Sequence, residues 1–96
     1  MEQIKISEQD IINALCLYIS DKKEVSPYEV DMELMFDDEY GFSAESHVAG
    51  RKQILATVSI IEAIRFWLDT ELHVDPFAAG IELVLDDHEG IIAWVR

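Results

Sequence analysis

Residues 30–48, with the sequence VDMELMFDDEYGFSAESHV, decide the fold of this chain. A period of two separates four apolar side chains from three acids, as in a β-strand with one face in water: Val30, Met32, Leu34 and Phe36 against Asp31, Glu33 and Asp37. The acidic run at residues 37–41 ends on Gly41, which tolerates the positive φ angle of a hairpin loop. We therefore predict a β-hairpin, in which residues 42–48 form the returning strand.

An amphipathic helix is predicted on the N-terminal side of this hairpin, over about residues 8–22. Ser7 is a suitable N-cap. Asp10 follows three residues later, at the position where a capping box usually has glutamate or glutamine. The apolar stripe has helical spacing and consists of Ile11, Ile12, Ala14, Leu15, Tyr18 and Ile19. The helix is expected to end before Pro27, because proline cannot continue it.

The same pattern returns 49 residues later, which indicates an internal repeat. Eleven of the 37 residues at positions 60–96 are identical to the residue 49 places earlier, whereas chance gives about two or three. The second helix is predicted to begin near Ser59, and its stripe consists of Ile60, Ala63, Ile64, Trp67, Leu68 and Leu72. The second hairpin loop is residues 86–90. The alternative is that two unrelated halves share a generic amphipathic pattern.

Two further short strands are predicted, at residues 3–6 and 52–56, one before each helix. Helices with one apolar stripe and strands joined by hairpins pack economically when both helices cover one face of a sheet. We predict an α+β fold: a two-layer sandwich of an antiparallel sheet with two helices on one face, and an internal pseudo-twofold (β)αββ repeat. The 96 residues form a single domain with halves of about 1–49 and 50–96. The pattern leaves open whether the two halves share one continuous sheet.

Charge narrows the possible partners and location of the protein. Twenty acidic residues outweigh seven basic ones and give a net charge of −13. This charge excludes ordinary binding to nucleic-acid backbones and attraction to anionic membranes.

No apolar stretch approaches the 18 or so residues that cross a bilayer, and the first residues lack the pattern of a secretion signal. A single cysteine, Cys16, cannot form an intramolecular disulfide, so we expect a cytoplasmic protein.

The acidic loops are candidates for a site that binds a hard cation such as Ca²⁺ or Mg²⁺. The candidate metal ligands are Asp37, Asp38, Asp86 and Asp87. Neither loop has the spacing of the twelve-residue calcium loop, and hairpins favour aspartate because its side chain binds nearby backbone amides. The three histidines, His47, His73 and His88, share no ligand spacing on one element. We expect no cofactor and keep a metal site as the alternative.

No enzyme class is supported by a motif. Ser7 and Ser59 lie at predicted helix starts, without the glycine-flanked turn of a serine nucleophile. The four glycines are scattered and form no phosphate-binding loop. Cys16 has no cationic neighbour that would lower its pKa. We therefore do not expect catalysis, with a metal-dependent enzyme that uses the acidic loops as the alternative.

An interaction surface is the remaining candidate site. The outward face of the second hairpin is predicted to expose Val84, Ile92 and Trp94 together, and such apolar patches usually mark a contact surface. The alternatives are that the chain itself covers this face, or that a register shifted by one residue turns these side chains into the core. Leu17 and Phe66 occupy matching flanks of the two helices, where they pack against each other or against a second subunit.

We therefore expect a non-catalytic protein-interaction or regulatory module that self-associates, or that uses its acidity to select a basic partner. The partner is another copy or another protein, with no nucleic acid and no membrane. The alternative function is a divalent-cation binder or metal-dependent enzyme that uses the acidic hairpin loops. A third reading, a mimic of DNA that occupies a basic groove, follows from charge alone.

Four segments resemble a small bacterial family: KISE at residues 5–8, GFSAE at 41–45, GRKQ at 50–53 and IEAIR at 61–65. The chain is similar to the YxcD-type proteins of Firmicutes, which are short cytosolic proteins of unknown function. The likeness covers nearly the whole chain, but none of the four segments is a chemical signature. The resemblance implies a bacterial cytoplasmic protein and transfers no activity and no catalytic residue.

Overall fold

The computed structural model describes residues 3–73, 75 and 80–96. The elements are β1 (Ile4–Ile6), α1 (Glu8–Lys23), the 3₁₀ helix η1 (Pro27–Glu29), β2 (Val30–Asp37), β3 (Gly41–Val48), β4 (Arg51–Leu55), α2 (Thr57–Glu71), β5 (Ile81–Asp86) and β6 (Gly90–Val95). Apart from η1, the order strand, helix, strand, strand occurs twice, as the sequence predicts. The α+β class and the antiparallel pairing of the strands are confirmed.

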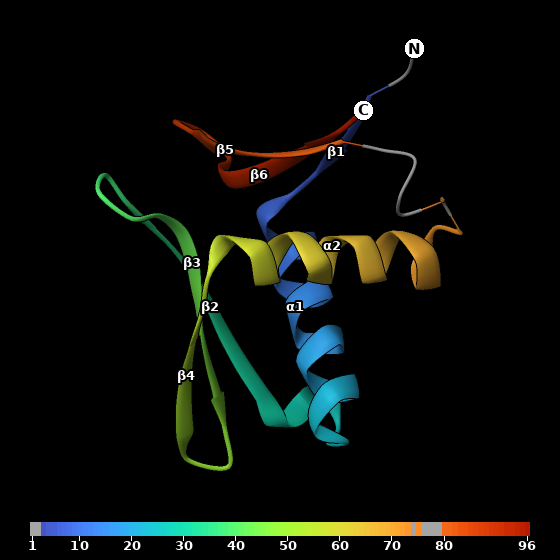
Figure 1. The fold of residues 1–96 in the computed structure, drawn as a ribbon, viewed down its shortest axis with the longest axis vertical. Coiled ribbons are helices and arrows are strands. Elements are labelled where there is room, and N and C mark those ends of the chain that lie inside the picture. Colours follow the sequence, from blue (N-terminus) through green and yellow to red (C-terminus); the bar gives the residue numbers. More distant parts are fainter. Residues whose placement is uncertain (1–2, 74, 76–79) are drawn as a thin grey trace.

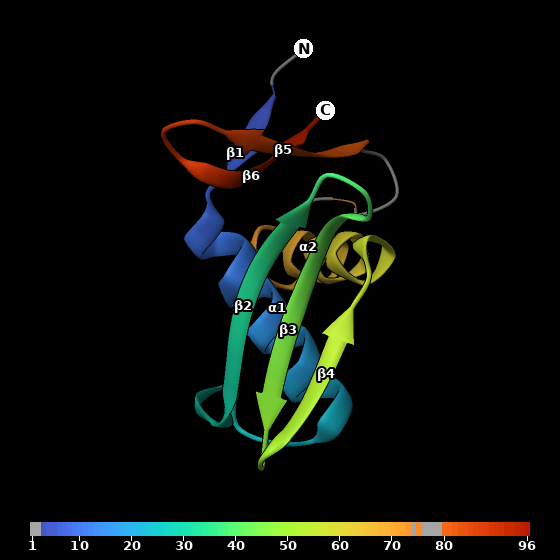
Figure 2. The ribbon, with the colours of Figure 1, turned by 90° about the vertical axis from the view of Figure 1, so that its left-hand side faces the viewer.

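The strands form two antiparallel sheets of three strands each, in the orders β1-β6-β5 and β2-β3-β4. Figures 1 and 2 show one sheet above the pair of helices and the other beside it. The two halves thus do not share one continuous sheet, a point that the sequence pattern left open, and the helices do not cover one face of a single layer. The helices instead occupy the corner between two sheets.

The connections of β1 and β4 explain this division. β4 follows β3 after a two-residue turn, in which Ala49 and Gly50 have positive φ angles of 51° and 77°, so it completes a meander with β2 and β3. Only Ser7 separates β1 from α1, and the 16 residues of α1 carry the chain about 24 Å along the helix axis before β2 begins. β1 therefore pairs with β6, where Ile6 lies opposite Ala93.

The pairing registers of the two sheets are related by the 49-residue offset seen in the sequence. Leu34 lies opposite Ala44 in the β2–β3 pair, and Leu83 lies opposite Ala93 in the β5–β6 pair. Leu55 lies opposite Ala44 in the β4–β3 pair, which matches the β1–β6 pairing described above. Each half thus adds its first strand to the hairpin of the other half. Common ancestry of the two halves stays a prediction.

The start of α1 agrees with the sequence, whereas α2 starts earlier than expected. Ser7 caps α1 and accepts a backbone hydrogen bond at 3.1 Å. α2 begins at Thr57, two residues before Ser59, and Ala56 at its N-cap makes no side-chain hydrogen bond. The Thr57 hydroxyl donates to the backbone carbonyl of Phe42 at 2.6 Å. The first turn of α2 is therefore tied to β3, which fixes the helix start without the predicted cap.

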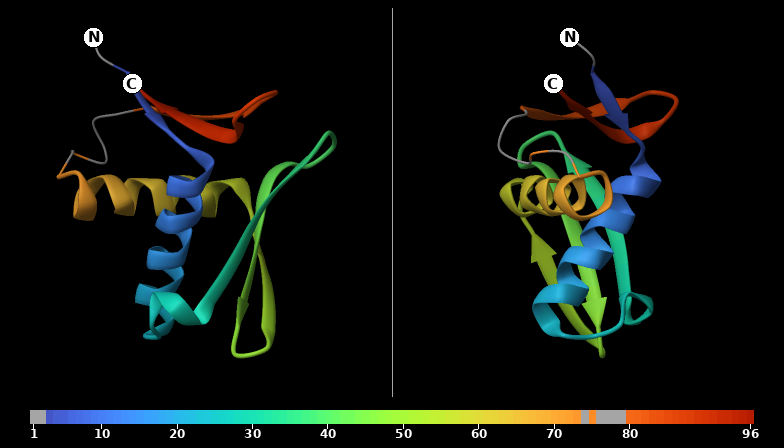
Figure 3. Two further views of the ribbon diagram at one scale, coloured as in Figure 1. Left: turned by 180° about the vertical axis from the view of Figure 1, so that it is seen from behind. Right: turned by 90° about the vertical axis from the view of Figure 1, so that its right-hand side faces the viewer.

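The core lies between the helix pair and the inner faces of both sheets. Residues from both halves meet there and are at most 3% exposed: Ile6, Ile11, Leu15, Ile60, Ile64, Leu68, Ala93 and Val95. The right-hand view of Figure 3 shows the two helices in front of the β2–β3–β4 sheet. In the described part of the chain, that side of the helix pair carries no strand.

Candidate functional site

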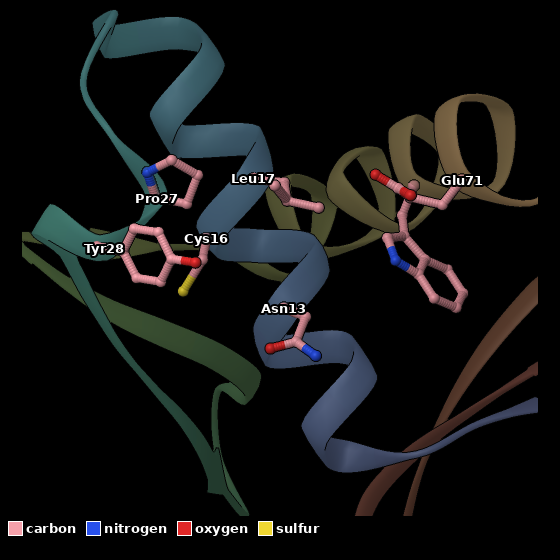
Figure 4. A pocket seen from close by; sticks show the side chains of 7 residues that line it. Asn13, Cys16, Leu17, Pro27, Tyr28 and Glu71 are labelled. Atoms are coloured by element: carbon pink, nitrogen blue, oxygen red, sulfur yellow. The ribbon is translucent and has the colours of Figure 1, made fainter.

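An open groove crosses α1 and brings together aromatic, apolar and polar side chains. Its volume is about 460 Å³, within the range of small ligand sites. It is lined by Asn13, Cys16, Leu17, Pro27, Tyr28, Trp67 and Glu71, and these seven residues define the α1 groove. Figure 4 shows Cys16, Pro27 and Tyr28 on one side of α1, and Glu71 beyond the other side.

Helical spacing explains why these side chains meet. Asn13 lies three residues before Cys16 and four before Leu17 on α1, so its side chain adjoins both. Cys16 and Leu17 are consecutive and point to different sides of the helix (Figure 4). Trp67 and Glu71 are four residues apart and share a face of α2. Both helices turn their buried stripes to the core. The groove residues therefore lie on the helix flanks, where they are half-buried or exposed.

The third wall of the groove, η1, is fixed by its own capping box. Ser26 accepts a hydrogen bond from the backbone N–H of Tyr28 at 3.3 Å, and Glu29 accepts one from the backbone N–H of Ser26 at 2.9 Å. Pro27 at the start of η1 has a φ angle already suited to the turn. This turn leaves Tyr28 99% exposed, and large exposed aromatic rings are enriched at contact surfaces.

The thiol of Cys16 is not activated for nucleophilic chemistry. Burial raises the pKa of Cys16 above its ordinary value, and the nearby carboxylate of Asp31 raises it further. The sulfur also donates to the backbone carbonyl of Val30 at 3.7 Å. Cys16 is therefore a neutral, half-buried thiol in the wall of the groove at neutral pH.

The two helix-flank residues singled out by the sequence have different surroundings. Leu17 is half-buried and lines the α1 groove. Phe66 packs edge-on against Tyr18, with the ring centroids 5.9 Å apart and the planes at 62°. Phe66 is thus occupied by a contact within the chain, whereas Leu17 borders an open surface.

The predicted apolar face of the second hairpin is closed at its centre. Ile92 is 2% exposed, so the prediction that it is open to a partner is wrong. Val84 lies opposite it, and Val84 and Trp94 are half-buried. Lys5 lies opposite Trp94 and forms an ion pair with Glu89 at 2.7 Å. The Lys5 side chain thus reaches from its place beside Trp94 to Glu89 before the start of β6.

The predicted metal ligands lie in two hairpin loops that use their first aspartate to bind the backbone. Asp37 and Asp86 each accept two hydrogen bonds, at 2.7 to 3.1 Å, from the backbone N–H groups two and three residues further on. Asp38 and Asp87 are exposed, and the two loops lie apart in Figure 2. Within residues 3–73, 75 and 80–96, no three His, Cys, Asp or Glu side chains gather to hold a metal.

Comparison with known proteins identifies the family. Residues 1–88 match the model of a family described as "Protein of unknown function (DUF2653)". The chain belongs to the DUF2653 family. No curated protein and no solved structure matches it. Family membership therefore adds no ligand or reaction to the geometry of the site.

Neither α1 nor α2 is long and apolar enough to cross a membrane, and this holds for every helix described.

A second hollow, which the sequence did not indicate, lies where the β2–β3–β4 sheet meets α2. Its volume is about 640 Å³, and it is lined by Asp37, Tyr40, Phe42, Ser43, Ile54, Ala56, Thr57 and Val58. Three of these are strongly exposed: Tyr40 at 83%, Ile54 at 54% and Val58 at 63%. Asp37 and Thr57 already form hydrogen bonds within the chain. The surface of the second hollow is therefore mainly apolar.

Sequence reasoning found Leu17 but not the rest of the α1 groove. The groove depends on how α2 crosses α1 and on where η1 places its side chains, and neither follows from periodicity. The available signal was Tyr28 directly after Pro27, where a short turn has no need of an aromatic ring.

Proposed function

We propose that this protein is a non-catalytic protein-interaction module of the cytoplasm, whose contact surface is the α1 groove and whose partner is a basic protein segment. The observation that carries the proposal is Tyr28, which is 99% exposed on a capped turn at the edge of the groove. Tyrosine and tryptophan contribute much of the binding energy at protein interfaces because they bury a large ring and still offer a polar group. The groove contains both, as Tyr28 and Trp67.

The net charge of −13 supports a basic partner over a second copy of the chain. Opposite charges accelerate association and raise selectivity, whereas two equally acidic copies repel each other at long range. Among the described residues that line the groove, Glu71 is acidic and none is basic. The neutral thiol of Cys16 supports a binding role for the groove rather than a catalytic one.

The test compares Tyr28→Ala with Tyr40→Ala. Both tyrosines are exposed, at 99% and 83%, so neither truncation is expected to change the free energy of unfolding by more than about 0.5 kcal/mol. Tyr40 belongs to the second hollow and therefore controls for the loss of an exposed ring. Purified wild type and both variants are incubated with a native lysate of the source cells, and retained proteins are quantified by mass spectrometry.

Support requires a basic protein whose retention falls at least about tenfold with Tyr28→Ala and persists with Tyr40→Ala. Equal retention of all partners by the three proteins would refute the α1 groove as the contact surface. Loss with Tyr40→Ala alone would move the contact surface to the second hollow.

Self-association is the second candidate, and the second hollow favours it. Ile54 is exposed on β4, an edge strand whose free backbone groups can pair with another chain. Val58 extends the apolar surface onto α2. Size-exclusion chromatography with light scattering should then show a dimer that Ile54→Lys dissociates. A monomer mass that is constant over a hundredfold dilution rejects this candidate.

We also infer that the chain is a YxcD-type protein of Firmicutes. The inference rests on the four segments quoted above, and the match of residues 1–88 to an uncharacterised family supports it at a coarser level. The free thiol of Cys16 supports the cytoplasmic location, because unpaired cysteines are ordinary in a reducing compartment.

A further inference from the structure

Equivalent residues on the flanks of the two helices are used in different ways. At the 49-residue offset the equivalent pairs are Asn13 and Glu62, Leu17 and Phe66, Tyr18 and Trp67, and Lys22 and Glu71. One flank combines Tyr18 and Lys22 with Glu62 and Phe66. The other flank combines Trp67 and Glu71 with Asn13 and Leu17, which all line the α1 groove. Comparison of the two flanks shows what the groove lacks.

The flank around Tyr18 is complete without a ligand. Phe66 packs against the edge of the Tyr18 ring, and the Tyr18 hydroxyl donates to the carboxylate of Glu62 at 2.7 Å. The ammonium nitrogen of Lys22 lies 4.7 Å from the centroid of the same ring. The chain therefore supplies its own cation to the face of Tyr18 and its own ring to the edge.

The flank around Trp67 is open at the two corresponding places. Leu17 is smaller than Phe66, so less of the space beside the ring is filled. Glu71 stands where Lys22 stands on the other flank, four residues after the ring and with the opposite charge. In the described part of the chain, the carboxylate of Glu71 makes no hydrogen bond or ion pair. The groove thus has an aromatic ring and an anion, and it lacks the cation that completes the other flank.

A cation placed between these two groups would gain from both. Tryptophan has the aromatic ring that attracts cations most strongly, and Trp67 is half-buried. The exposed carboxylate of Glu71 adds an ion pair. We propose that the α1 groove binds one cationic side chain, lysine or arginine, of a basic partner segment, between the Trp67 ring and the Glu71 carboxylate. This inference rests on the proposed function and names the anchor residue that the partner contributes.

The form of the groove explains why the cation belongs to a peptide segment. The groove extends from η1 on one side of α1 to the last turn of α2 on the other (Figure 4). Between its ends it offers the apolar side chains of Leu17 and Pro27, and Tyr28 stands at its edge. A cation at Glu71 therefore leaves apolar wall for the neighbouring residues of the segment. Leucine beside the basic residue suits this wall.

The test is a titration followed by the indole N–H resonances of the ¹⁵N-labelled protein, assigned with a Trp94→Phe variant. The probes are the peptides acetyl-Gly-Leu-Arg-Leu-Gly-amide, its lysine counterpart and its citrulline counterpart, which keeps the shape of arginine without the charge. The Trp67 resonance should shift to saturation with arginine or lysine, and at least about tenfold more weakly with citrulline. Trp94 lies outside the groove and its resonance should stay in place.

A pair of charge variants tests the role of the carboxylate. Glu71→Gln should weaken binding of the cationic peptide up to about fivefold, because it removes an exposed ion pair and keeps the side-chain shape. Asp69→Asn removes the same charge from an exposed position of α2 outside the groove. Its affinity should stay within about twofold of wild type, since screening reduces the effect of distant exposed charges.

Two results would overturn the inference and leave the proposed function standing, as judged by Tyr28→Ala. One is equal affinity for the arginine and citrulline peptides, and the other is an equal effect of Glu71→Gln and Asp69→Asn. Absence of any shift at Trp67 with all three peptides also overturns it. The proposed function fails separately, when partner retention is indifferent to Tyr28→Ala.

Discussion

The carboxylate of Glu8 accepts a hydrogen bond of 2.8 Å from the backbone N–H of Ile91, which lies 83 residues further along the chain. Ile6 pairs with Ala93 at the end of β1, so continuation of the same register would place residue 8 opposite Ile91. Residue 8 belongs to α1 and not to a strand. The Glu8 carboxylate therefore accepts the hydrogen bond from Ile91 that a strand carbonyl would otherwise accept. Hydrogen bonds with a charged acceptor are stronger than neutral ones, so this contact holds the start of α1 against β6.

The equivalent contact in the other half joins Thr57 to Phe42. Both residues lie at the 49-residue offset from Glu8 and Ile91, and the Thr57 hydroxyl donates to the Phe42 carbonyl at 2.6 Å. The side chain at the first position of each helix thus binds the backbone of the neighbouring sheet. The donor and acceptor roles are reversed between the halves, because threonine offers a hydroxyl hydrogen and ionised glutamate offers none.

Replacement of Gly90 by alanine should cost more stability than replacement of Gly41. The two glycines have φ angles of 79° and 78°, so alanine pays the same left-handed backbone cost at both, about 1 kcal/mol. A methyl group at Gly90 would overlap the Glu8 carboxylate, whereas nothing lies within 4 Å of one at Gly41. Displacement of Glu8 loses a charged hydrogen bond, which adds about 1 to 2 kcal/mol. Urea denaturation measures both differences.

The double variant isolates the contact with Glu8. In a Glu8→Ala background, Gly90→Ala should cost no more than Gly41→Ala. Equal costs of the two glycine replacements in the wild-type background would contradict the Glu8 contact.

Local patterns predict the elements of this fold, and the division into two sheets lies beyond them. The alternation from Val30 to Phe36 and the glycine at position 41 define the hairpin because strand period and turn chemistry are local properties. The pairing of Ile6 with Ala93 joins residues 87 positions apart. That pairing depends on the length of α1 and on the turn at Ala49, which a periodic pattern does not specify.

The candidate site follows the same division between local and distant information. Leu17 is recognisable as a flank residue because helical spacing assigns it to the edge of the stripe. Ile92 is only 2% exposed although it lies outside the main core cluster, and strand alternation alone does not predict this burial. Glu71 occupies the position equivalent to Lys22. The difference gains meaning only from the structure, which places the Lys22 ammonium over the Tyr18 ring and Glu71 beside Trp67 in the groove.

Replacement of Ala49 by asparagine should stabilise the protein. Ala49 is exposed and has a φ angle of 51° in the two-residue turn before Gly50. Asparagine is favoured at this position of such turns, and alanine loses about 1 kcal/mol in the left-handed region. Ala49→Asn should therefore raise the free energy of unfolding by about 0.5 to 1 kcal/mol in urea denaturation. A loss of stability would mean that the turn has a different conformation.

Replacement of Ser46 by alanine should be neutral or stabilising. Ser46 is 1% exposed, and its hydroxyl has no hydrogen-bond partner among the described residues. The equivalent position in the other half is Val95, which is 3% exposed and apolar. Removal of an unpaired buried hydroxyl gains up to about 1 kcal/mol, less the cost of the small void that remains. A thermal-melting loss equivalent to more than about 1 kcal/mol would show that the hydroxyl has a partner.

Divalent cations should leave the melting temperature unchanged apart from the effect of ionic strength. Asp37 and Asp86 each use one carboxylate oxygen to bind the backbone of their own loop, and in the described part of the chain no three side chains suited to a metal gather around the remaining oxygens. Melting is followed in Mg²⁺, Ca²⁺, Mn²⁺ and Zn²⁺, with NaCl of equal ionic strength as the control. A saturable rise that Asp37→Asn and Asp86→Asn abolish would establish the cation site, because a ligand of the native state stabilises it by mass action.

Titration of Asp86 should contribute to acid denaturation. Backbone hydrogen bonds from His88 and then Glu89 lower the pKa of Asp86 below its ordinary value of 3.8. A lowered native pKa gives stability that is present above the unfolded pKa and is lost as the pH falls from about 3.8 through the native value. Asp86→Asn removes this dependence, so the urea midpoint should fall less steeply between pH 5 and pH 2 than in wild type. Asp87→Asn, one residue further on, controls for the loss of a negative charge, and equal slopes for the two variants would contradict the role of Asp86.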